Sequence, residues 1–542
     1  MLKNYLLVAF RNISKNSIFS GVNIAGLAIG MAACLLILQY VTFELSYDTF
    51  NVYSARLYRI NQDRYTIGKL STQWAAGASA AGPAFKSALP EIEDYAKLLN
   101  REQQLINDKD KHLVIRNDYF VSNSFFKLFS YPLLQGDRAA VLKEPNTVVL
   151  SATTAKKLFD QENPVGKTIL VGKRAVKVSG IIQDMPTNSH LKLEFMEAYA
   201  TLNVIEPPTP TWDREKQWFS DGYITYLLLK PGVDVKALES KFAPIASQGM
   251  ADIPNESVTY SVQLVKDIHL YSNRMMEAES NGDGKAVYLL LGIAIFVIVI
   301  AWINYINLAT ARGMARAKEV GVRKTLGSGK WQLIFQFLLE AMVLNGLAIV
   351  LAGCIIALLI PAFATLTGMP MGLNLFIESK FWILCFLLFL AGSVLSGFYP
   401  AIILSAYRPV DVLKGKISNS QKGVVLRKSM VVFQFAASIF LLISSLTVYR
   451  QVAFMQQQKL GVSIEQTLVI QSPLVQVDSL NRDMQAFELE NLSQSAIMSI
   501  AISTDVPGSA IGWNMGRLRL KGETEDKGVQ ARIPADNFLP NT

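Results

Sequence analysis

The longest features of the sequence are five stretches that contain no Asp, Glu, Lys or Arg. They run from Asn16 to Phe43, Ala286 to Ala311, Ala341 to Ile377, Phe381 to Tyr407 and Ser429 to Tyr449. About 20 predominantly apolar residues in an α-helix cross the hydrocarbon core of a bilayer. The pattern therefore predicts an α-helical integral membrane protein with five membrane-spanning helices. The predicted spans are residues 17–43, 286–311, 337–361, 381–407 and 429–449.

The third stretch is longer than one crossing requires. We place its helix at Phe337 to Pro361 and expect the remainder, which contains glycine and proline, to form a turn. Residues 362–380 then make a short loop before the fourth span.

Residues 44–285 separate the first two spans and are numerous enough to form a domain with its own core. Tyr223–Leu229 has the composition of a strand, Pro231 and Gly232 predict a turn, and Asp234 is placed to cap a helix. That helix would carry Leu238, Phe242 and Ile245 on one face.

Two further strands follow from the polar and apolar pattern of the same segment. Apolar residues alternate with polar ones from Val258 to Leu264, and residues 175–182 form a second short apolar run after a turn at Gly166. We therefore expect 44–285 to be an α+β domain.

The charged residues predict an orientation. Residues 1–16 contain three basic residues and no acidic one. Residues 312–330 and 408–428 each contain six basic residues and one acidic residue. Because short basic loops stay in the cytoplasm, we expect these segments inside and 44–285, 362–380 and 450–542 outside. The net charge of +9 and pI of about 9.1 thus indicate contact with membrane lipid and not with nucleic acid.

The sequence offers no evident catalytic, metal or cofactor site. Gly166, Lys167 and Thr168 resemble a phosphate loop, but Gln161 stands where its first glycine belongs, and Trp331 replaces the hydroxyl residue after Gly327–Lys330. His112, His190 and His269 are widely spaced and lack cysteine neighbours. The predicted spans hold no ionisable residue, so no proton or substrate path through them is expected.

Gly26 and Gly30 form a G-x-x-x-G pattern in the first span. Glycines at this spacing allow two membrane helices to approach closely. We predict that these two residues are a helix-packing site.

A weak internal repeat links the two halves of the chain. Basic residues, a long apolar helix and an outer segment recur, with alternation at 57–60 and again at 467–470, and Asn117–Phe120 resembles Ala535–Phe538. Residues 450–542 are thus expected to be a partial second extracytoplasmic domain. We expect the chain to be a truncated product of a longer gene, which sequencing downstream of codon 542 would test.

Residues 309–330 combine regularly spaced arginines and lysines with small apolar residues, which predicts a short cytoplasmic helix. The charges alone would indicate a positively charged loop that anchors the chain at the membrane. The sequence AKEVGVRKTLG at Ala317–Gly327 resembles the cytoplasmic signature of the MacB and FtsX-like family of ABC transporter permeases. The family is also resembled by NPVGKTI (163–169), DMPTNSHL (184–191), YPAIILSAYRPVDVLKG (399–415) and the opening 27 residues from Leu6.

The resemblance implies four helices and a MacB-like periplasmic domain per unit, pairing as a homodimer or as duplicated halves, and contact with an ABC ATPase through the loop between the second and third helices. It assigns that contact to Glu319, Gly321, Arg323 and Lys324. It implies no cofactor. MacB carries its own N-terminal ATPase, whereas this chain begins 16 residues before its first span, so a separate ATPase subunit is expected. With its fifth helix, the chain resembles a duplicated, eight-helix form of the family.

The resemblance implies a permease subunit of the bacterial inner membrane that couples ATP hydrolysis to movement of its outer domain, without enzymatic activity of its own. Peptides, antibiotics or lipid-linked molecules would be its cargo, with a periplasmic adaptor and an outer-membrane channel as further partners. Two alternatives stay open: an ATPase-driven regulator of cell-wall hydrolases, and a membrane-anchored sensor without an ATPase.

Overall fold

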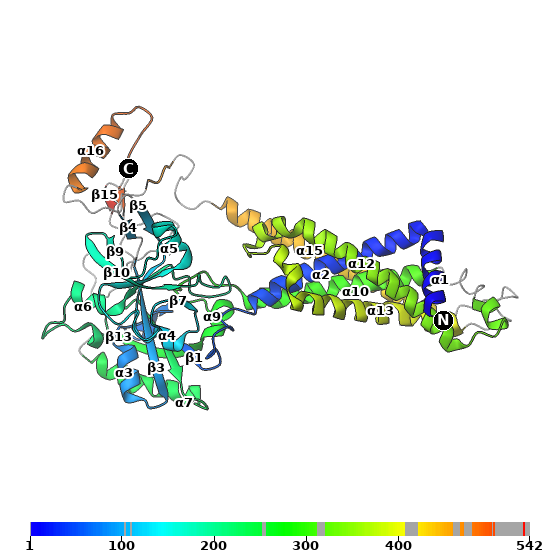
Figure 1. The fold of residues 1–542 in the computed structure, drawn as a ribbon, viewed down its shortest axis with the longest axis horizontal. Coiled ribbons are helices and arrows are strands. Elements are labelled where there is room, and N and C mark those ends of the chain that lie inside the picture. Colours follow the sequence, from blue (N-terminus) through cyan, green and yellow to red (C-terminus); the bar gives the residue numbers. More distant parts are fainter. Residues whose placement is uncertain are drawn as a thin grey trace. The chain divides into compact units, whose positions relative to one another are not determined.

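The computed structural model describes residues 2–101, 104–108, 111–219, 221–251, 256–311, 320–406, 421–458, 467–470, 480–500, 502–503 and 535–536. They belong to two compact units (Figure 1). Met1–Leu45 and Asp283–Gln458 make the first, here called the helical unit. Ser46–Gly282 and Lys459–Thr542 make the second, the strand-rich unit.

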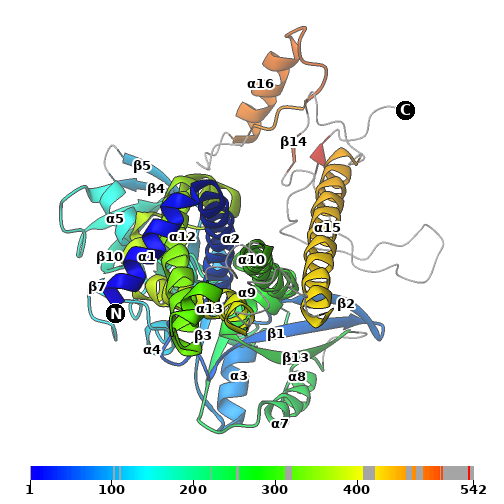
Figure 2. The ribbon, with the colours of Figure 1, turned by 90° about the vertical axis from the view of Figure 1, so that its right-hand side faces the viewer.

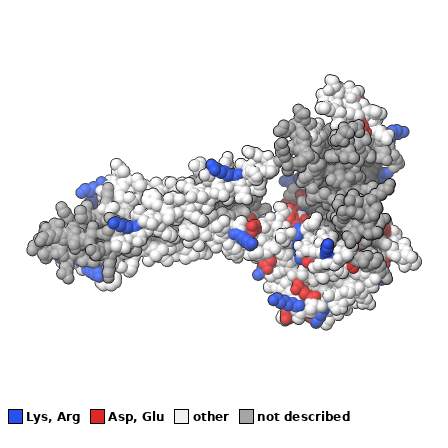
Figure 3. Space-filling model, turned by 180° about the vertical axis from the view of Figure 1, so that it is seen from behind, with Lys and Arg blue, Asp and Glu red and all other residues white. Residues whose placement is uncertain are grey.

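The helical unit contains the five long apolar helices that the sequence predicts, preceded by a shorter one. Its elements are α1 (Leu2–Lys15), α2 (Ser17–Glu44), α10 (Gly284–Ala311), α12 (Lys330–Thr367), η3 (Leu373–Ile377), α13 (Ser379–Ala406) and α15 (Gln421–Gln457). All but α1 and η3 are long and apolar enough to cross a membrane. On the face seen in Figure 3, the described surface of this unit is mostly uncharged and carries a few basic side chains.

Helices α2, α10, α12 and α13 form one bundle. α2 packs against α10 and α12, and α12 packs along α13. Leu27, Trp302, Leu344 and Cys385 are among the buried residues of their shared core. By contrast, α15 lies beside α10 (Figure 2) and buries none of its most apolar 18-residue window.

Several helices extend beyond the charge-free stretches that defined the predicted spans. The largest difference is α15, expected at 429–449 and observed as Gln421–Gln457. Charged side chains do not end a helix, so a charge-free run marks the part suited to hydrocarbon and not the helix bounds.

The predicted end of the third span at Pro361 is wrong, because α12 continues to Thr367. Proline removes one backbone hydrogen bond and crowds the carbonyl four residues earlier, and membrane helices tolerate this where neighbouring groups satisfy the freed carbonyl. The helix ends at Gly368, whose φ of +67° lies in the left-handed region that favours glycine.

The strand-rich unit is α+β, as expected. Its strands are β1 (Leu57–Thr66), β2 (Lys69–Trp74), β3 (Ile92–Arg101), β4 (Gln104–Asp108), β5 (Lys111–Ile115), β6 (Asp118–Val121), β7 (Leu133–Gln135), β8 (Thr147–Ser151), β9 (Thr168–Val171), β10 (Arg174–Ile182), β11 (Phe195–Ala198), β12 (Tyr223–Leu229) and β13 (Glu256–Leu264). Its helices are α3 (Ala81–Ala88), α4 (Phe125–Leu128), α5 (Ala152–Phe159), η1 (Tyr199–Thr201), α6 (Leu202–Ile205), η2 (Arg214–Lys216), α7 (Val235–Ser240), α8 (Phe242–Gly249) and α9 (Val265–Tyr271).

These strands join in one mixed sheet. Its order is β13-β1-β12-β3-β6-β11-β8-β10-β9-β4-β5, with β2 paired to β1 and β7 to β10. The β6/β11 and β8/β10 pairs are parallel and the other pairs are antiparallel. One apolar cluster joins Phe85 of α3 and Phe242 of α8 to the strands around β12, and another joins Leu158 of α5 to β8, β9 and β10.

The strands predicted at 223–229, 258–264 and 175–182 are all present as β12, β13 and β10. Asp234 caps α7 by accepting from the backbone N–H groups of Lys236 and Ala237. The single helix expected after it is two helices, α7 and α8, separated at Lys241. Pro244 explains the break, because proline cannot donate the backbone hydrogen bond that would continue α7.

A buried polar network fixes the first residues of the strand-rich unit. Asp48 is fully buried, and its carboxylate lies 2.8 Å from Nδ1 of His190. Nε2 of the same imidazole lies 2.7 Å from the hydroxyl of Tyr226 on β12. His190, one of the three histidines without a metal-like spacing, thus tethers this segment to the sheet.

The described part of the C-terminal segment contains helix α16 (Leu480–Leu492) and a two-stranded pair, β14 (Ile502–Ser503) with β15 (Ala535–Asp536). Residues 467–470 form no regular secondary structure. The alternation there therefore did not produce a strand like the one at 57–60. Asn537 and Phe538 lie outside the described residues, and the second outer domain stays a prediction.

Candidate functional site

The predicted ATPase-contact segment joins α10 to α12. Residues 320–325 are helical, followed by a turn at Leu326 and Gly327. Gly327 has a φ of +96°, and the backbone N–H of Ser328 donates to the carbonyl of Arg323 at 3.0 Å. We call residues 320–331 the coupling segment. Glu319, one of the four predicted contact residues, lies outside the described residues.

The other three predicted residues have different environments. Gly321 is buried beside the buried Val320, whereas Arg323 and Lys324 are partly exposed. The Arg323 guanidinium donates to the side-chain oxygen of Gln336 on α12. Partial burial lowers the pKa of the Lys324 ammonium from its usual value, and the nearby charge of Lys330 lowers it further.

Apolar side chains complete the surface of the coupling segment. Leu326 is 81% exposed and Trp331 77% exposed, with Val322 also exposed. An exposed indole and an exposed leucine beside cations suit a surface that another protein covers. The sequence analysis missed these residues because it followed the charges, although their apolar character between basic residues was visible.

Glu340 corrects the expectation that the predicted spans hold no ionisable residue. It lies within 337–361, in the third turn of α12, and is only 7% exposed. Its carboxylate accepts a hydrogen bond of 2.7 Å from the Asn12 amide of α1. A charge on an apolar helix is costly unless it is paired, and it marks a position of functional interest.

The glycine pattern in α2 faces α10. A Cβ atom added at Gly30 would lie 2.6 Å from Cβ of Ala301, and one at Gly26 would lie 3.5 Å from Nδ2 of Asn304. The first distance is shorter than real Cβ contacts allow. The packing role of both glycines stays a prediction, now with a defined neighbouring helix.

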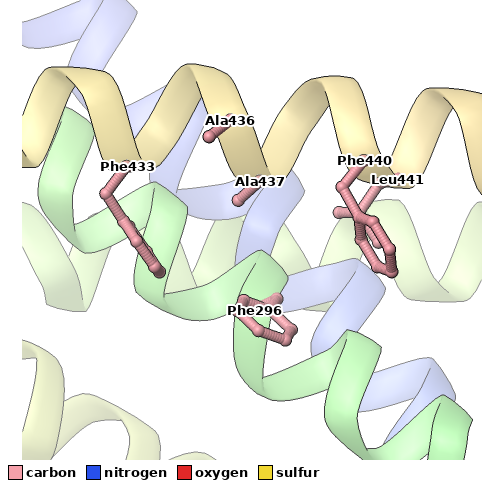
Figure 4. A pocket seen from close by; sticks show the side chains of 6 residues that line it. All are labelled: Phe296, Phe433, Ala436, Ala437, Phe440 and Leu441. Carbon is pink, nitrogen blue, oxygen red and sulfur yellow. The ribbon is translucent and has the colours of Figure 1, made fainter.

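A groove of about 330 Å³ lies between α10 and α15 (Figure 4). It is lined by Phe296, Phe433, Ala436, Ala437, Phe440 and Leu441. The ring centroids of Phe296 and Phe433 lie 6.3 Å apart. The lining is apolar throughout, so the groove suits hydrocarbon and offers no polar group for catalysis.

Within the part of the chain that the structure describes, no group of three or more His, Cys, Asp or Glu side chains could hold a metal ion. The coupling segment is a candidate surface for protein contact. Its cations and exposed apolar side chains suit a protein partner.

Comparisons with known proteins agree with this architecture. The sequence model of the MacB-like periplasmic core domain matches residues 20–245. That of the FtsX-like permease C-terminal family matches residues 291–409. The first covers α2 and most of the strand-rich unit, and the second covers α10 through α13, including the coupling segment.

Individual relatives are distant. The macrolide export ATP-binding/permease protein MacB of Haemophilus ducreyi is 22% identical over 54% of this chain, which spans 39% of that protein. The ABC transporter permease YvrN of Bacillus subtilis is 22% identical over 76% of this chain and 99% of its own length. The periplasmic region of MacB from Actinobacillus actinomycetemcomitans, a solved structure, covers 38% of this chain at 16% identity with a TM-score of 0.28.

Five apolar helices and a large α+β extracytoplasmic domain define a multi-pass membrane protein. The two matched domains, in this order along one chain, place it further: it belongs to the MacB/FtsX-like family of ABC transporter permeases. The chain spans about two fifths or less of the MacB proteins of Haemophilus ducreyi and Aggregatibacter actinomycetemcomitans.

Proposed function

We propose that the chain is the permease subunit of an ABC transporter and that a separate ATPase binds its coupling segment. The observation that carries the proposal is the exposed surface of Val322, Leu326 and Trp331 beside Arg323, Lys324 and Lys330, braced on α12 through Gln336. Apolar anchors with charged neighbours are the usual composition of a specific protein contact.

In this proposal the ATPase contact has a different composition from the one expected from the sequence alone. Arg323 and Lys324, with Glu319, supply charge that orients the partner. Leu326 and Trp331 supply most of the buried apolar area. Gly321 is buried, so its role is to let the segment pack closely on the bundle and not to touch the partner.

The mechanism that follows is transmission of movement. ATP binding by the partner displaces the coupling segment, and the packed helices carry this displacement to the extracytoplasmic domain. Stiff, closely packed apolar helices suit this task, because they transmit displacement and offer a hydrophilic cargo no polar path. Cargo would therefore be moved on the outer side of the membrane.

The cargo to be exported would be peptides, antibiotics or lipid-linked molecules. The name of the Haemophilus ducreyi relative, a macrolide exporter, supports antibiotics. The proposal places the chain in the bacterial inner membrane with its N-terminus inside. It works as a dimer or as paired halves, with a periplasmic adaptor and an outer-membrane channel as further partners.

Purification of the tagged chain from its native membrane in mild detergent tests the proposal. We expect an ABC ATPase to co-purify and the complex to hydrolyse ATP. An adaptor among the companions supports export, and a cell-wall hydrolase supports the regulatory alternative. Absence of any ATPase from the purified assembly, with the coupling segment intact, would favour a membrane-anchored sensor.

Charged substitutions at the coupling segment and at the preceding Glu319 should weaken the complex without preventing membrane insertion. We expect Arg323→Glu, Glu319→Lys or Leu326→Asp to lower ATPase co-purification by about tenfold or more, since interface anchors contribute at least about 1.4 kcal/mol. Lys380→Glu is the control, because Lys380 is exposed in the first turn of α13, which follows the loop at the opposite end of α12. Full ATPase recovery with all three coupling-segment variants would remove the assigned contact surface.

A further inference from the structure

Two hydrogen bonds on the first turns of α12 tie it to different parts of the helical unit. Arg323 of the coupling segment donates to Gln336, and Asn12 of α1 donates to Glu340. Gln336 and Glu340 are four residues apart, so they lie on the same face of the helix with a rise of about 6 Å between them. The coupling segment and α1 are thus braced on neighbouring turns of one helix.

The same face is polar at the preceding turn as well. The side chain of Gln332 accepts from the backbone N–H of Gly329, at 3.1 Å, where the coupling segment meets α12. Residues 332, 336 and 340 therefore form a polar stripe at the start of a helix that carries no charged residue from Ala341 to Thr367. Each member of the stripe holds a segment outside α12.

Asn12 lies at the corner where α1 meets α2. Asn16 is the single residue between the two helices, and its backbone conformation is not helical, with φ −120° and ψ 48°. Its side-chain amide donates to Oδ1 of Asn12 at 2.9 Å, and its carbonyl accepts from the backbone N–H of Ser20 in the first turn of α2. The chain of contacts from Glu340 therefore ends on α2.

The first helix is also packed against α12 by its side chains. The ring of Tyr5 meets the ring of Phe335 edge to face, with centroids 6.1 Å apart. Ile13 packs against the buried core of the bundle. These contacts hold α1 to the bundle at positions before and after Asn12.

We propose that Glu340 is a positioning residue that links the coupling segment to the α1–α2 corner through Asn12 and Asn16. The inference deepens the proposed function, on which it rests, by naming a route from the coupling segment to the helix that leads into the strand-rich unit. A hydrogen bond from Asn12 to a carboxylate at 340 holds the corner more firmly than a bond to a neutral acceptor would.

The route is testable in the full-length chain in lipid nanodiscs, without an ATPase. Amide hydrogen exchange is measured over residues 2–20. We expect Arg323→Ala to speed exchange there on the order of tenfold, as loss of a hydrogen bond to a charged group would. Lys324→Ala, which leaves the Arg323–Gln336 bond in place, should not change it, and Glu340→Gln, which keeps a side-chain acceptor for Asn12, should keep the response to Arg323→Ala.

A double variant separates the route from general loosening. Asn12→Leu with Glu340→Leu removes both partners of the bond without leaving either alone, and adding Arg323→Ala to it should speed exchange over residues 2–20 no further. The proposal is overturned if Arg323→Ala has no effect on these amides in the natural chain, or if its effect persists in the double variant. Because no ATPase is present, these outcomes are independent of whether the partner proposed above exists.

Discussion

At Gly30 the space for a side chain is already occupied by the neighbouring helix. Because an added Cβ would meet Cβ of Ala301 at 2.6 Å, we expect Gly30→Leu to separate α2 from α10 and to cost about 1–3 kcal/mol, as overpacking typically does. Thermal unfolding in detergent measures the change. Gly21→Leu is the matched control on the same helix, since nothing lies within 4 Å of its Cβ position.

A compensating change tests the assignment of the neighbour. Gly30→Ala should be destabilising alone and partly restored by Ala301→Gly, which removes the opposing methyl group. If Ala301→Gly gives no rescue, α2 packs on a different face from the one described. The G-x-x-x-G pattern was readable in the sequence, but its partner helix was not, because spacing within one helix does not identify the other.

Asp221 should make the stability of the strand-rich unit pH-dependent. Burial raises the pKa of its carboxyl to about 6, although Arg64 and Gln62 favour the charged form. In the unfolded chain the group titrates near 4. Between about pH 4 and 6 the folded state therefore binds more protons, and its stability falls as the pH rises.

Asp221→Asn keeps a side-chain oxygen for Gln62 but does not titrate. Relative to this variant, the natural chain should lose up to about 3 kcal/mol of stability between pH 4 and pH 7. Tryptophan fluorescence during thermal unfolding at several pH values gives the comparison. A constant difference between the two proteins across this range would show that Asp221 titrates normally in the fold.

Among the five candidate spans in the described part of the chain, α15 is the least buried. It packs on α10 beside an apolar groove of about 330 Å³. Ala437→Leu should fill part of this groove and slow amide hydrogen exchange along α15, with a gain of about 1 kcal/mol from added apolar contact. Ser445→Leu adds the same side chain at an exposed position that does not line the groove, and equal slowing by both variants would count against packing in the groove.

The limits of the sequence analysis are clearest in α12 and α15. Apolar composition predicted both helices, because the hydrocarbon core of a bilayer requires it. The ends of a helix depend on local geometry: α12 continues through Pro361 and stops before Gly368, whose backbone is left-handed. The exposed Leu326 and Trp331 and the bond between Asn12 and Glu340 join residues by tertiary packing. A pair 328 positions apart in the chain leaves no periodic signal in one sequence.

For the strand-rich unit, local patterns were sufficient for individual strands but not for the sheet. Tyr223–Leu229 was identified by composition, and the structure shows why it carries so many apolar residues: all seven residues of β12 are buried. Its neighbours β1 and β3 are separated from it by more than 120 residues of sequence. Such pairing depends on long-range contacts that alternation does not encode.

At the scale of the whole molecule, the distribution of basic residues predicts which ends of the helices face the cytoplasm. Because Lys and Arg concentrate in 1–16, 312–330 and 408–428, the coupling segment should lie inside and the strand-rich unit outside.

Single cysteines test this orientation in a chain whose natural Cys34, Cys354 and Cys385 are replaced by alanine. In sealed cells from which the outer membrane has been removed, a membrane-impermeant maleimide should label Lys236→Cys, an exposed position of α7, and should leave Leu326→Cys unlabelled. Disruption of the membrane should expose Leu326→Cys fully, since the leucine is 81% exposed. Labelling of Leu326→Cys in sealed cells would reverse the orientation, and with it the proposed ATPase contact, because ATP and its hydrolases are available only on the cytoplasmic side.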